Sequence, residues 1–176
     1  LLNINDTDIT LVQGHTGGLS SIAIDDQGLN LVTGSSDGTL RLWSRLSFQA
    51  KTLLAGHEDV ITSLGFSANG DVIATASKDA SIRLWDSATA ETIQVLRGHD
   101  KFATCLAFSP NGEWLASGTG ERSKVDPKTG ARTKLKSEIR LWDAKQGEFF
   151  SAFQHHSKYL TDMAFSPDSR FLAVAS

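Results

Sequence analysis

The stretch that decides the fold runs from Gly56 to Asp86 and reads GHEDVITSLGFSANGDVIATASKDASIRLWD. It opens on a Gly-His pair. The same pair recurs at a constant step of 42 residues, at Gly14-His15, Gly56-His57 and Gly98-His99. A fixed period of roughly 20–50 residues is typical of repeat architectures, in which one supersecondary unit is stacked on copies of itself. The chain is therefore predicted to be a repeat protein.

Each unit closes on a tryptophan in a short apolar run, at Leu42-Trp43-Ser44, Leu84-Trp85-Asp86 and Leu141-Trp142-Asp143. Within the second unit, segments that alternate or are rich in branched side chains are separated by turn residues such as Asn69-Gly70. The strands predicted there are Val60 to Phe66, Asp71 to Ala76, Ser81 to Trp85 and Glu91 to Leu96. One unit is thus predicted to be a twisted sheet of four antiparallel strands.

Such a sheet is apolar on both faces and is not stable until neighbours cover it. Radial stacking into a propeller covers both faces. The Gly-His start, the Leu-Trp-Asp end and the repeat length resemble the WD-repeat β-propeller family over all 176 residues. The resemblance implies an all-β fold: a β-propeller of four-stranded antiparallel blades. This chain would hold about three and a half blades of a seven-bladed ring.

The resemblance implies one partial propeller over residues 1–176. The predicted repeats span 14–55, 56–97 and 98–154, followed by a partial repeat at 155–176, and the third repeat carries an inserted basic β-ribbon at 120–136. Ile9 to Val12 is expected to be a fourth strand that completes the last blade of the ring. The remaining blades are expected from the rest of a longer chain or from a second copy.

In this family, a histidine, a hydroxyl, a turn aspartate and the tryptophan form a hydrogen-bonded tetrad in each blade. The resemblance implies such tetrads at His15, Thr33, Asp37 and Trp43, and at His57, Thr75, Asp79 and Trp85. The residue types also suit a catalytic Ser-His-Asp arrangement, but a catalytic site needs one copy in a cleft, whereas a structural element is needed in every blade. The repetition therefore favours a structural role.

The later units depart from this pattern. The third keeps His99, Ser117 and Trp142, but an insertion of 15 residues removes the turn aspartate. The fourth has His156, but Val174 stands where the hydroxyl belongs, so its tetrad is not expected to close.

The insertion is strongly basic. Residues 121–136 carry six basic and two acidic side chains, a net charge of +4, and the rest of the chain then carries −7. The basic residues are Arg122, Lys124, Lys128, Arg132, Lys134 and Lys136. We interpret the segment as a β-ribbon that docks an acidic protein or peptide; the alternative is a solvated hairpin whose charges keep it soluble. Nucleic acid is less favoured, since the ribbon has no aromatic side chain for base stacking and the body is acidic.

Related propellers present side chains at the top rim three and five residues after each histidine. Here these include Phe102 and Thr104 in the third unit and Tyr159 in the fourth, and Lys78 is expected on the same face. Aromatic and basic side chains together are typical of binding hot spots. The alternative is that the two rings pack between blades or under the ribbon.

The chain shows no metal-ligand cluster, phosphate loop or nucleophile elbow, so no cofactor, metal or enzymatic activity is predicted. His155-His156 has no second ligand pair near it. Cys105 lies in an apolar run and is expected to be a buried, inert thiol. Neither a signal peptide nor a membrane span is predicted, and an intracellular, cytoplasmic location is favoured.

Together these features favour a non-catalytic scaffold that binds a protein or peptide on the top face of the propeller. The alternative function is a sensory or regulatory propeller in a larger signalling protein, such as a nucleotide-switch ATPase or a kinase. An ATP-binding module elsewhere in the gene product would favour that alternative.

Overall fold

The structure is a computed structural model that describes residues 13–44, 47, 50–120, 122–125, 128–130, 132–135, 137–155 and 159–176. The described residues form strands and turns, without a helix. The predicted strand at Ile9 to Val12 lies outside the described residues. The all-β fold predicted from the sequence is confirmed.

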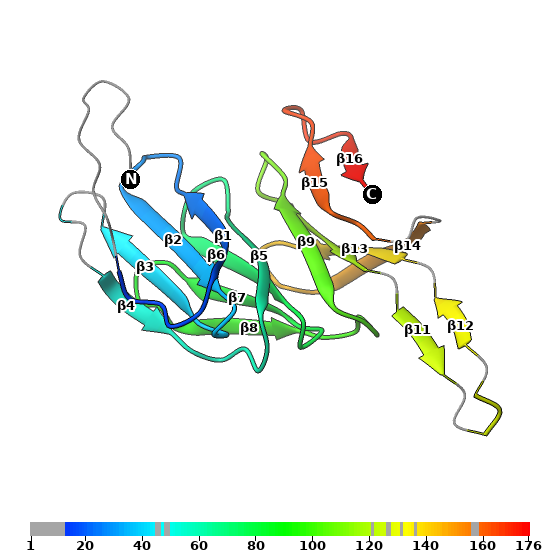
Figure 1. The fold of residues 1–176 in the computed structure, drawn as a ribbon. Helices are drawn as coiled ribbons and strands as arrows, with labels where there is room; N and C mark the ends of the chain where they lie inside the picture. The colour runs from blue at the N-terminus through cyan, green and yellow to red at the C-terminus, as the bar shows by residue number, and fades with distance from the viewer. Residues whose placement is uncertain are drawn as a thin grey trace.

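Three sheets have four antiparallel strands each, and they lie side by side (Figure 1). The first contains β1 (Leu19–Ile24), β2 (Asn30–Ser35), β3 (Leu40–Ser44) and β4 (Ala50–Leu54). The second contains β5 (Ile61–Phe66), β6 (Val72–Ser77), β7 (Ile82–Asp86) and β8 (Thr92–Leu96). The third contains β9 (Ala103–Phe108), β10 (Trp114–Thr119), β13 (Ser137–Asp143) and β14 (Phe149–His155). Strands within each sheet follow chain order, as expected for blades of a propeller.

Two smaller sheets complete the described part of the chain. A two-stranded ribbon of β11 (Arg122–Val125) and β12 (Arg132–Leu135) projects away from the blades (Figure 1). The pair β15 (Asp162–Phe165) and β16 (Leu172–Ala175) packs beside the third sheet as the first half of a fourth blade.

Tight turns join the strands, and one position in them requires a left-handed backbone in every blade. Gly70 takes it with φ +77° in the second blade, and Gly112 takes it with φ +72° in the third. Ser169 stands at the same place in the fourth, with φ +59°. Glycine adopts this conformation without steric cost, which explains the Asn-Gly signal at this turn.

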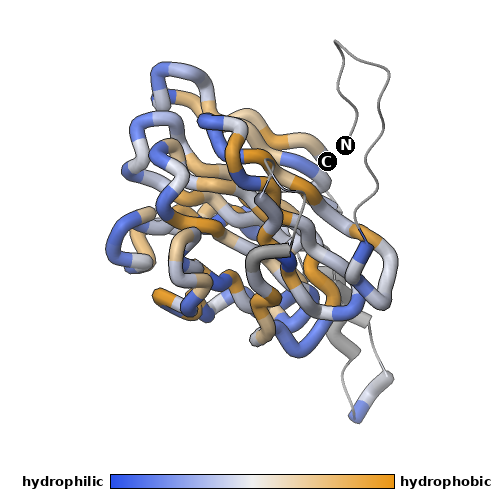
Figure 2. The backbone as a smooth tube through the Cα atoms, turned by 90° about the vertical axis from the view of Figure 1, so that its left-hand side faces the viewer, coloured by the Kyte–Doolittle hydropathy of each residue, from blue (hydrophilic) through white to orange (hydrophobic). Residues whose placement is uncertain are grey.

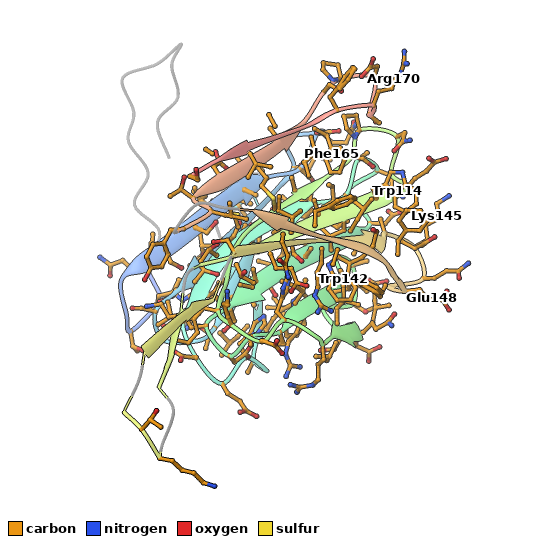
Figure 3. All side chains as sticks on the ribbon, turned by 90° about the vertical axis from the view of Figure 1, so that its right-hand side faces the viewer. Trp114, Trp142, Lys145, Glu148, Phe165 and Arg170 are labelled. Carbon is orange, nitrogen blue, oxygen red and sulfur yellow. The ribbon has the colours of Figure 1, made fainter. Side chains whose placement is uncertain are left out.

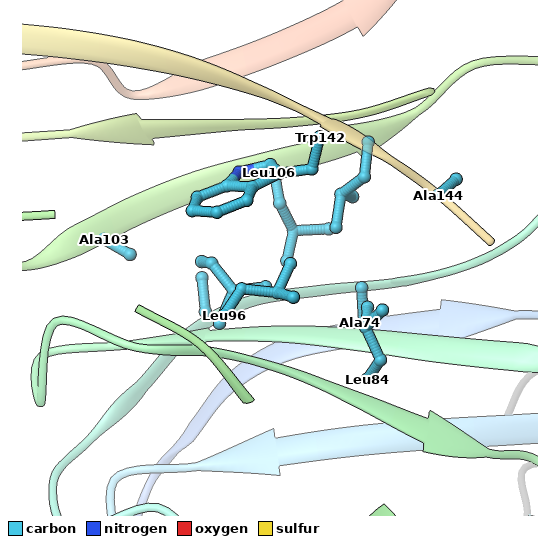
Figure 4. Packing of buried hydrophobic residues seen from close by; sticks show 10 residues of the cluster. Ala74, Leu84, Leu96, Ala103, Leu106, Trp142 and Ala144 are labelled. Atoms are coloured by element: carbon cyan, nitrogen blue, oxygen red, sulfur yellow. The ribbon is translucent and has the colours of Figure 1, made fainter. Parts of the chain in front are cut away.

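Apolar side chains pack between neighbouring sheets. In Figure 2 the hydrophobic colour lies mainly along the long inner segments of the tube and the hydrophilic colour mainly in the outer loops. Three buried clusters occur, one for each pair of adjacent sheets. Between the second and third sheets, Leu84, Leu96, Leu106 and Trp142 meet the small side chains of Ala74 and its neighbours (Figure 4). Burying each of the larger side chains contributes about 1.5–3 kcal/mol, so the stacking of the blades stabilises the fold.

The outer face of the first sheet is not covered by any described residue. Leu19, Ile22 and Ile24 are 65%, 60% and 51% exposed. Their counterparts 42 residues later lie on the face of β5 that packs against the first sheet, where Ile61 and Leu64 are buried. The repeat therefore gives β1 a face suited to packing against another blade.

Candidate functional site: the top face and its ribbon

The second blade contains a continuous chain of side-chain hydrogen bonds. The Nδ1 atom of His57 lies 2.8 Å from Oδ2 of Asp79, and its Nε2 atom lies 2.7 Å from Oγ1 of Thr75. The indole N–H of Trp85 donates to the same Thr75 hydroxyl at 2.9 Å. The hydroxyl accepts from the indole and donates to the imidazole, which requires the proton of a neutral His57 to sit on Nδ1, facing the carboxylate.

Asp79 is held by more than the histidine. Burial alone would raise its pKa, but hydrogen bonds from Ser81, from His57 and from the backbone N–H of Glu58 outweigh this and lower the pKa to about 2. The pKa of His57 is lowered because burial disfavours its charged form more than Asp79 favours it. At neutral pH this blade therefore holds an ionised aspartate beside a neutral histidine.

The first blade brings together the same set, 42 residues earlier in the chain. Nδ1 of His15 lies 3.3 Å from Oδ2 of Asp37, and Nε2 lies 2.8 Å from Oγ1 of Thr33. Trp43 donates to Thr33 at 2.9 Å. Thr39 takes the place of Ser81 and donates to Oδ1 of Asp37 at 2.6 Å.

The third blade closes the hydroxyl end in the same way. Nε2 of His99 lies 2.6 Å from Oγ of Ser117, which accepts from the indole of Trp142 at 2.8 Å. Sequence reasoning left His99 without an acid, but the structure places Oε2 of Glu138 3.5 Å from its Nδ1 atom. That distance is too long for a well-formed hydrogen bond, and we describe the pair as a close polar contact.

The fourth unit contributes no described tetrad. His156 lies outside the described residues, and Val174 packs, partly buried, against the apolar cluster between the third sheet and β15–β16. An apolar residue at the hydroxyl position therefore joins the core instead.

The buried hydroxyls of these tetrads are poorly placed for catalysis. Thr75 and Ser117 have no exposed surface, and each hydroxyl is already shared between an indole and an imidazole. A nucleophile must reach its substrate and be free to attack it. In the first blade, a hollow of about 420 Å³ reaches His15, Thr33 and Trp43, but it opens on the face of β1 that lacks a covering sheet.

Within the insertion, β11 and β12 form a two-stranded antiparallel ribbon. Its strands pair in register, with Arg122 opposite Leu135 and Val125 opposite Arg132. Gly130 takes φ +68° in the turn, and Lys128 is exposed beside it. Directly opposed residues of an antiparallel pair share a face, so positions 122, 124, 133 and 135 lie on one face and positions 123, 125, 132 and 134 on the other. The four basic positions of the strands thus divide equally between the two faces.

The root of the ribbon lies between Phe102 and Tyr159, the two aromatic residues predicted at the rim. The backbone N–H of Gly120 donates to the carbonyl of Phe102 at 3.3 Å, and Gly120 forms an isolated bridge with Tyr159. A Cβ added at Gly120 would lie 2.6 Å from Cδ1 of the Tyr159 ring, so a larger residue there would displace this ring. Phe102 is 38% exposed and Tyr159 55% exposed, so both rings reach the surface while Tyr159 also packs against the root.

Thr104 and Lys78 were also predicted at the rim; the first contacts the neighbouring blade and the second is exposed on a turn. The Thr104 hydroxyl donates to the carbonyl of Leu160 at 2.7 Å, with the Gly118 carbonyl at 3.2 Å. Thr62 makes the matching contact to Ala103 at 2.7 Å. Thr104 thus connects neighbouring blades, and its one donor is used there. Lys78 is exposed next to Asp79, on the turn between β6 and β7.

Among the described residues, no group of three or more histidine, cysteine or acidic side chains could hold a metal ion. The part of the chain that the structure describes also contains no helix long and apolar enough to cross a membrane. Cys105 is buried, and burial raises the pKa of its thiol.

The stacked four-stranded sheets and their repeated tetrads define a β-propeller built from equivalent blades. The chain belongs to the WD40 family, whose model (WD domain, G-beta repeat) matches residues 7–44, 48–86, 90–124 and 147–176. Most of the insertion falls in the gap between the third and fourth matches. Propellers of this family are typically non-catalytic scaffolds for protein interactions, and this coarse function is the one that the fold supports.

Individual relatives extend the comparison. The chain is 53% identical to the ribosome biogenesis protein ERB1 of Candida albicans over 38 residues, which is 22% of this chain and 4% of that protein. It is 47% identical to ERB1 of Chaetomium thermophilum over 38 residues, 22% of this chain and 5% of that protein. The solved structure of U3-55K superposes with a TM-score of 0.73 at 14% identity, covering 86% of this chain and 44% of that chain. This last likeness shows the fold alone.

Proposed function

We propose that this propeller is a non-catalytic scaffold that binds an acidic protein or peptide on its top face, with the basic ribbon as a docking arm. The observation that carries the proposal is the position of the ribbon root. Gly120 lies between the Phe102 backbone and the Tyr159 ring, so two exposed aromatic rings flank the base of a basic arm.

The chemistry of this surface suits such a partner. Aromatic side chains supply most of the binding energy at typical interfaces, while charges at the rim steer encounter and fix register. Lys78 adds a further exposed basic side chain on this face. A body of opposite charge to the ribbon repels acidic partners elsewhere on the surface, which directs them to the arm.

The first test reverses charge on the ribbon one face at a time. Arg122→Glu with Lys124→Glu changes one face, and Arg132→Glu with Lys134→Glu changes the other. Adding Lys128→Glu to either pair also removes the exposed charge at the turn. Lys145→Glu with Arg170→Glu is the matched control, because Figure 3 shows both side chains at the end of the sheets opposite the ribbon.

The readout is affinity capture of partners with the intact protein. We expect at least one ribbon pair to lose partners that the control pair retains, and Phe102→Ala or Tyr159→Ala to weaken the same partners. Identical partner sets for all variants would contradict the docking arm. If the ribbon variants lose captured RNA but keep the same proteins, and nuclease treatment of the parent has the same effect, the arm binds nucleic acid instead.

A second, narrower function comes from the relatives. These relatives are ribosome biogenesis proteins, and we propose a role in an intracellular ribosome-assembly complex as the next candidate. The matched stretch is 38 residues, about one repeat long, so it supports the repeat type more strongly than the process. Co-sedimentation of the protein with ribosome precursors on a sucrose gradient would support this candidate, and migration only with light fractions would contradict it. A regulatory propeller within a signalling protein stays the alternative prediction.

A further inference from the structure

In each of the first two blades, a turn aspartate and a hydroxyl residue two positions later lie beside the histidine. In the third blade, a single residue lies there. Thr39 and Ser81 occupy equivalent positions at the start of β3 and β7, and each supports the turn aspartate that faces the histidine. The equivalent position in the third blade, 57 residues after Ser81, is Glu138. We propose that Glu138 supplies the missing carboxylate of the third tetrad and thereby fixes the root of the inserted ribbon to the core of the blade.

The first support is that His99 is buried and that its Nδ1 atom has no hydrogen-bond partner among the described residues. Its side chain is 1% exposed, and its Nε2 atom is engaged by the Ser117 hydroxyl. With Ser117 already accepting from Trp142, its own proton goes to Nε2, and the imidazole proton must lie on Nδ1. The Nδ1 atom has no well-formed hydrogen bond, and the Glu138 carboxylate, 3.5 Å away, is the acceptor that faces it.

The second support is the arginine of the same strand. An arginine two residues before the tryptophan packs against the Gly-His turn in each blade. In the first two blades, the Nε atoms of Arg41 and Arg83 are buried without a hydrogen-bond partner. In the third, Nε of Arg140 donates to Oε2 of Glu138 at 3.0 Å. The Glu138 carboxylate therefore lies against both His99 and the arginine of the same strand, whereas the arginine Nε atoms of the first two blades have no hydrogen-bond partner in the part of the chain that the structure describes.

The third support is a change of partner at the end of β10. Ser35 and Ser77 accept from the backbone N–H of the turn aspartate, at 3.2 Å and 3.1 Å. Thr119 holds the equivalent position and accepts from the backbone N–H of Glu138 instead, at 2.9 Å, while its hydroxyl lies 3.3 Å from the Glu138 carbonyl. Glu138 thus makes both contacts that the turn aspartate makes in the other blades: its backbone N–H donates to the hydroxyl at the end of the preceding strand, and its carboxylate faces the histidine.

These contacts place both ends of the ribbon on rigid groups. Thr119 ends β10, which leads into the ribbon through Gly120, and Glu138 is the second residue of β13, into which the ribbon returns. Thr119 is 1% exposed and Glu138 contacts the buried His99, so the root is joined to the core and not only to the surface. A preorganised arm loses less conformational entropy on binding than a loose loop does. This consequence rests on the proposed docking function, but the proposal itself does not.

The test is the rate of tryptic cleavage within the ribbon of the intact protein, followed by mass spectrometry. Glu138→Ala removes the acceptor, and we expect cleavage after positions 122–134 to become about 3–10-fold faster while cleavage after Lys145 is unchanged. Glu138→Gln keeps a neutral acceptor and is expected to fall between Glu138→Ala and the parent. Glu121→Ala, at an acidic residue within the insertion, is the control and should leave the rate unchanged.

A ribbon cleaved at the parental rate in both Glu138 variants would overturn the proposal. So would a faster rate in Glu121→Ala alone, which would assign the carboxylate role to that residue.

If Glu138→Ala proves too unstable to purify, the nitrogen NMR signals of His99 in Glu138→Gln test the proposal. The proposal expects these signals to shift in Glu138→Gln and not in Glu121→Ala. Unchanged His99 signals in Glu138→Gln would overturn it even when the ribbon is cleaved faster. Because no partner is involved, failure of the docking proposal would leave this result unaffected.

Discussion

At the scale of single residues, the stability of a blade depends on hydrogen bonds that one substitution can remove. Asp79→Ala removes the carboxylate that faces Nδ1 of the buried His57 and that accepts from the N–H of Glu58 and the hydroxyl of Ser81. We expect the free energy of unfolding to fall by about 1–3 kcal/mol. Urea denaturation measures it, with Asp71→Ala on an exposed turn as the control. A midpoint equal to that of the control would contradict a structural role for this tetrad.

The same residues predict how stability depends on pH. Burial first, and the charge of Arg140 second, lower the pKa of His99 to about 4, although Glu138 and Asp100 act in the opposite direction. Since the unfolded histidine has a pKa of about 6.5, the unfolded state binds the proton first as pH falls, and stability decreases between about pH 6.5 and 4. The loss is up to about 3 kcal/mol. Below about pH 4, protonation of Asp79 adds a further loss down to about pH 2.

Urea denaturation at several pH values between 7.5 and 4.5 measures the first of these losses. His99→Asn should show a weaker dependence than the parent across that window. A parent whose stability is constant between pH 7 and 4.5 would show that His99 is not held neutral.

At the scale of elements, the turns offer an internal comparison of glycine with other residues. Gly38 takes φ +78° in the first blade, and Ala80 takes φ +67° at the same position in the second. A left-handed alanine costs about 1–2 kcal/mol. The greater unfolded-state entropy of glycine offsets about 0.4–1 kcal/mol of this. We therefore expect Ala80→Gly to stabilise the protein by about 0.5–1 kcal/mol and Gly38→Ala to destabilise it similarly. Thermal melting measures both, and a lower midpoint for Ala80→Gly would contradict this account.

The bounds of the strands were the feature that the sequence predicted most accurately. The strands of the second unit begin and end within one residue of their predicted bounds, because alternation and turn residues are local signals. Glu138 was not predicted, since the insertion breaks the alignment and the acid has moved from a turn to a strand. Thr104 was predicted at the binding rim, but its hydroxyl bonds a carbonyl of the next blade, a contact that only the stacking of blades creates.

At the scale of the whole molecule, each sheet depends on its neighbours, and the repeat allows this dependence to be measured. Leu64 and Ile22 are equivalent residues 42 positions apart, yet Leu64 is 7% exposed and Ile22 is 60% exposed. Leu64→Ala should cost about 2–5 kcal/mol, because it opens a cavity between two blades. In the arrangement described here, Ile22→Ala removes an exposed side chain and should cost less than about 0.5 kcal/mol.

The two free energies, measured by urea denaturation in one protein, report whether a further blade packs on β1. A difference of more than about 1.5 kcal/mol corresponds to an uncovered face. Equal costs at the two positions would contradict the prediction for Ile22 and would mean that another blade covers Leu19, Ile22 and Ile24 as the first sheet covers Ile61 and Leu64. The chemistry of the face is the same in both cases, because the repeat places branched apolar residues at these positions whether or not a neighbour is present.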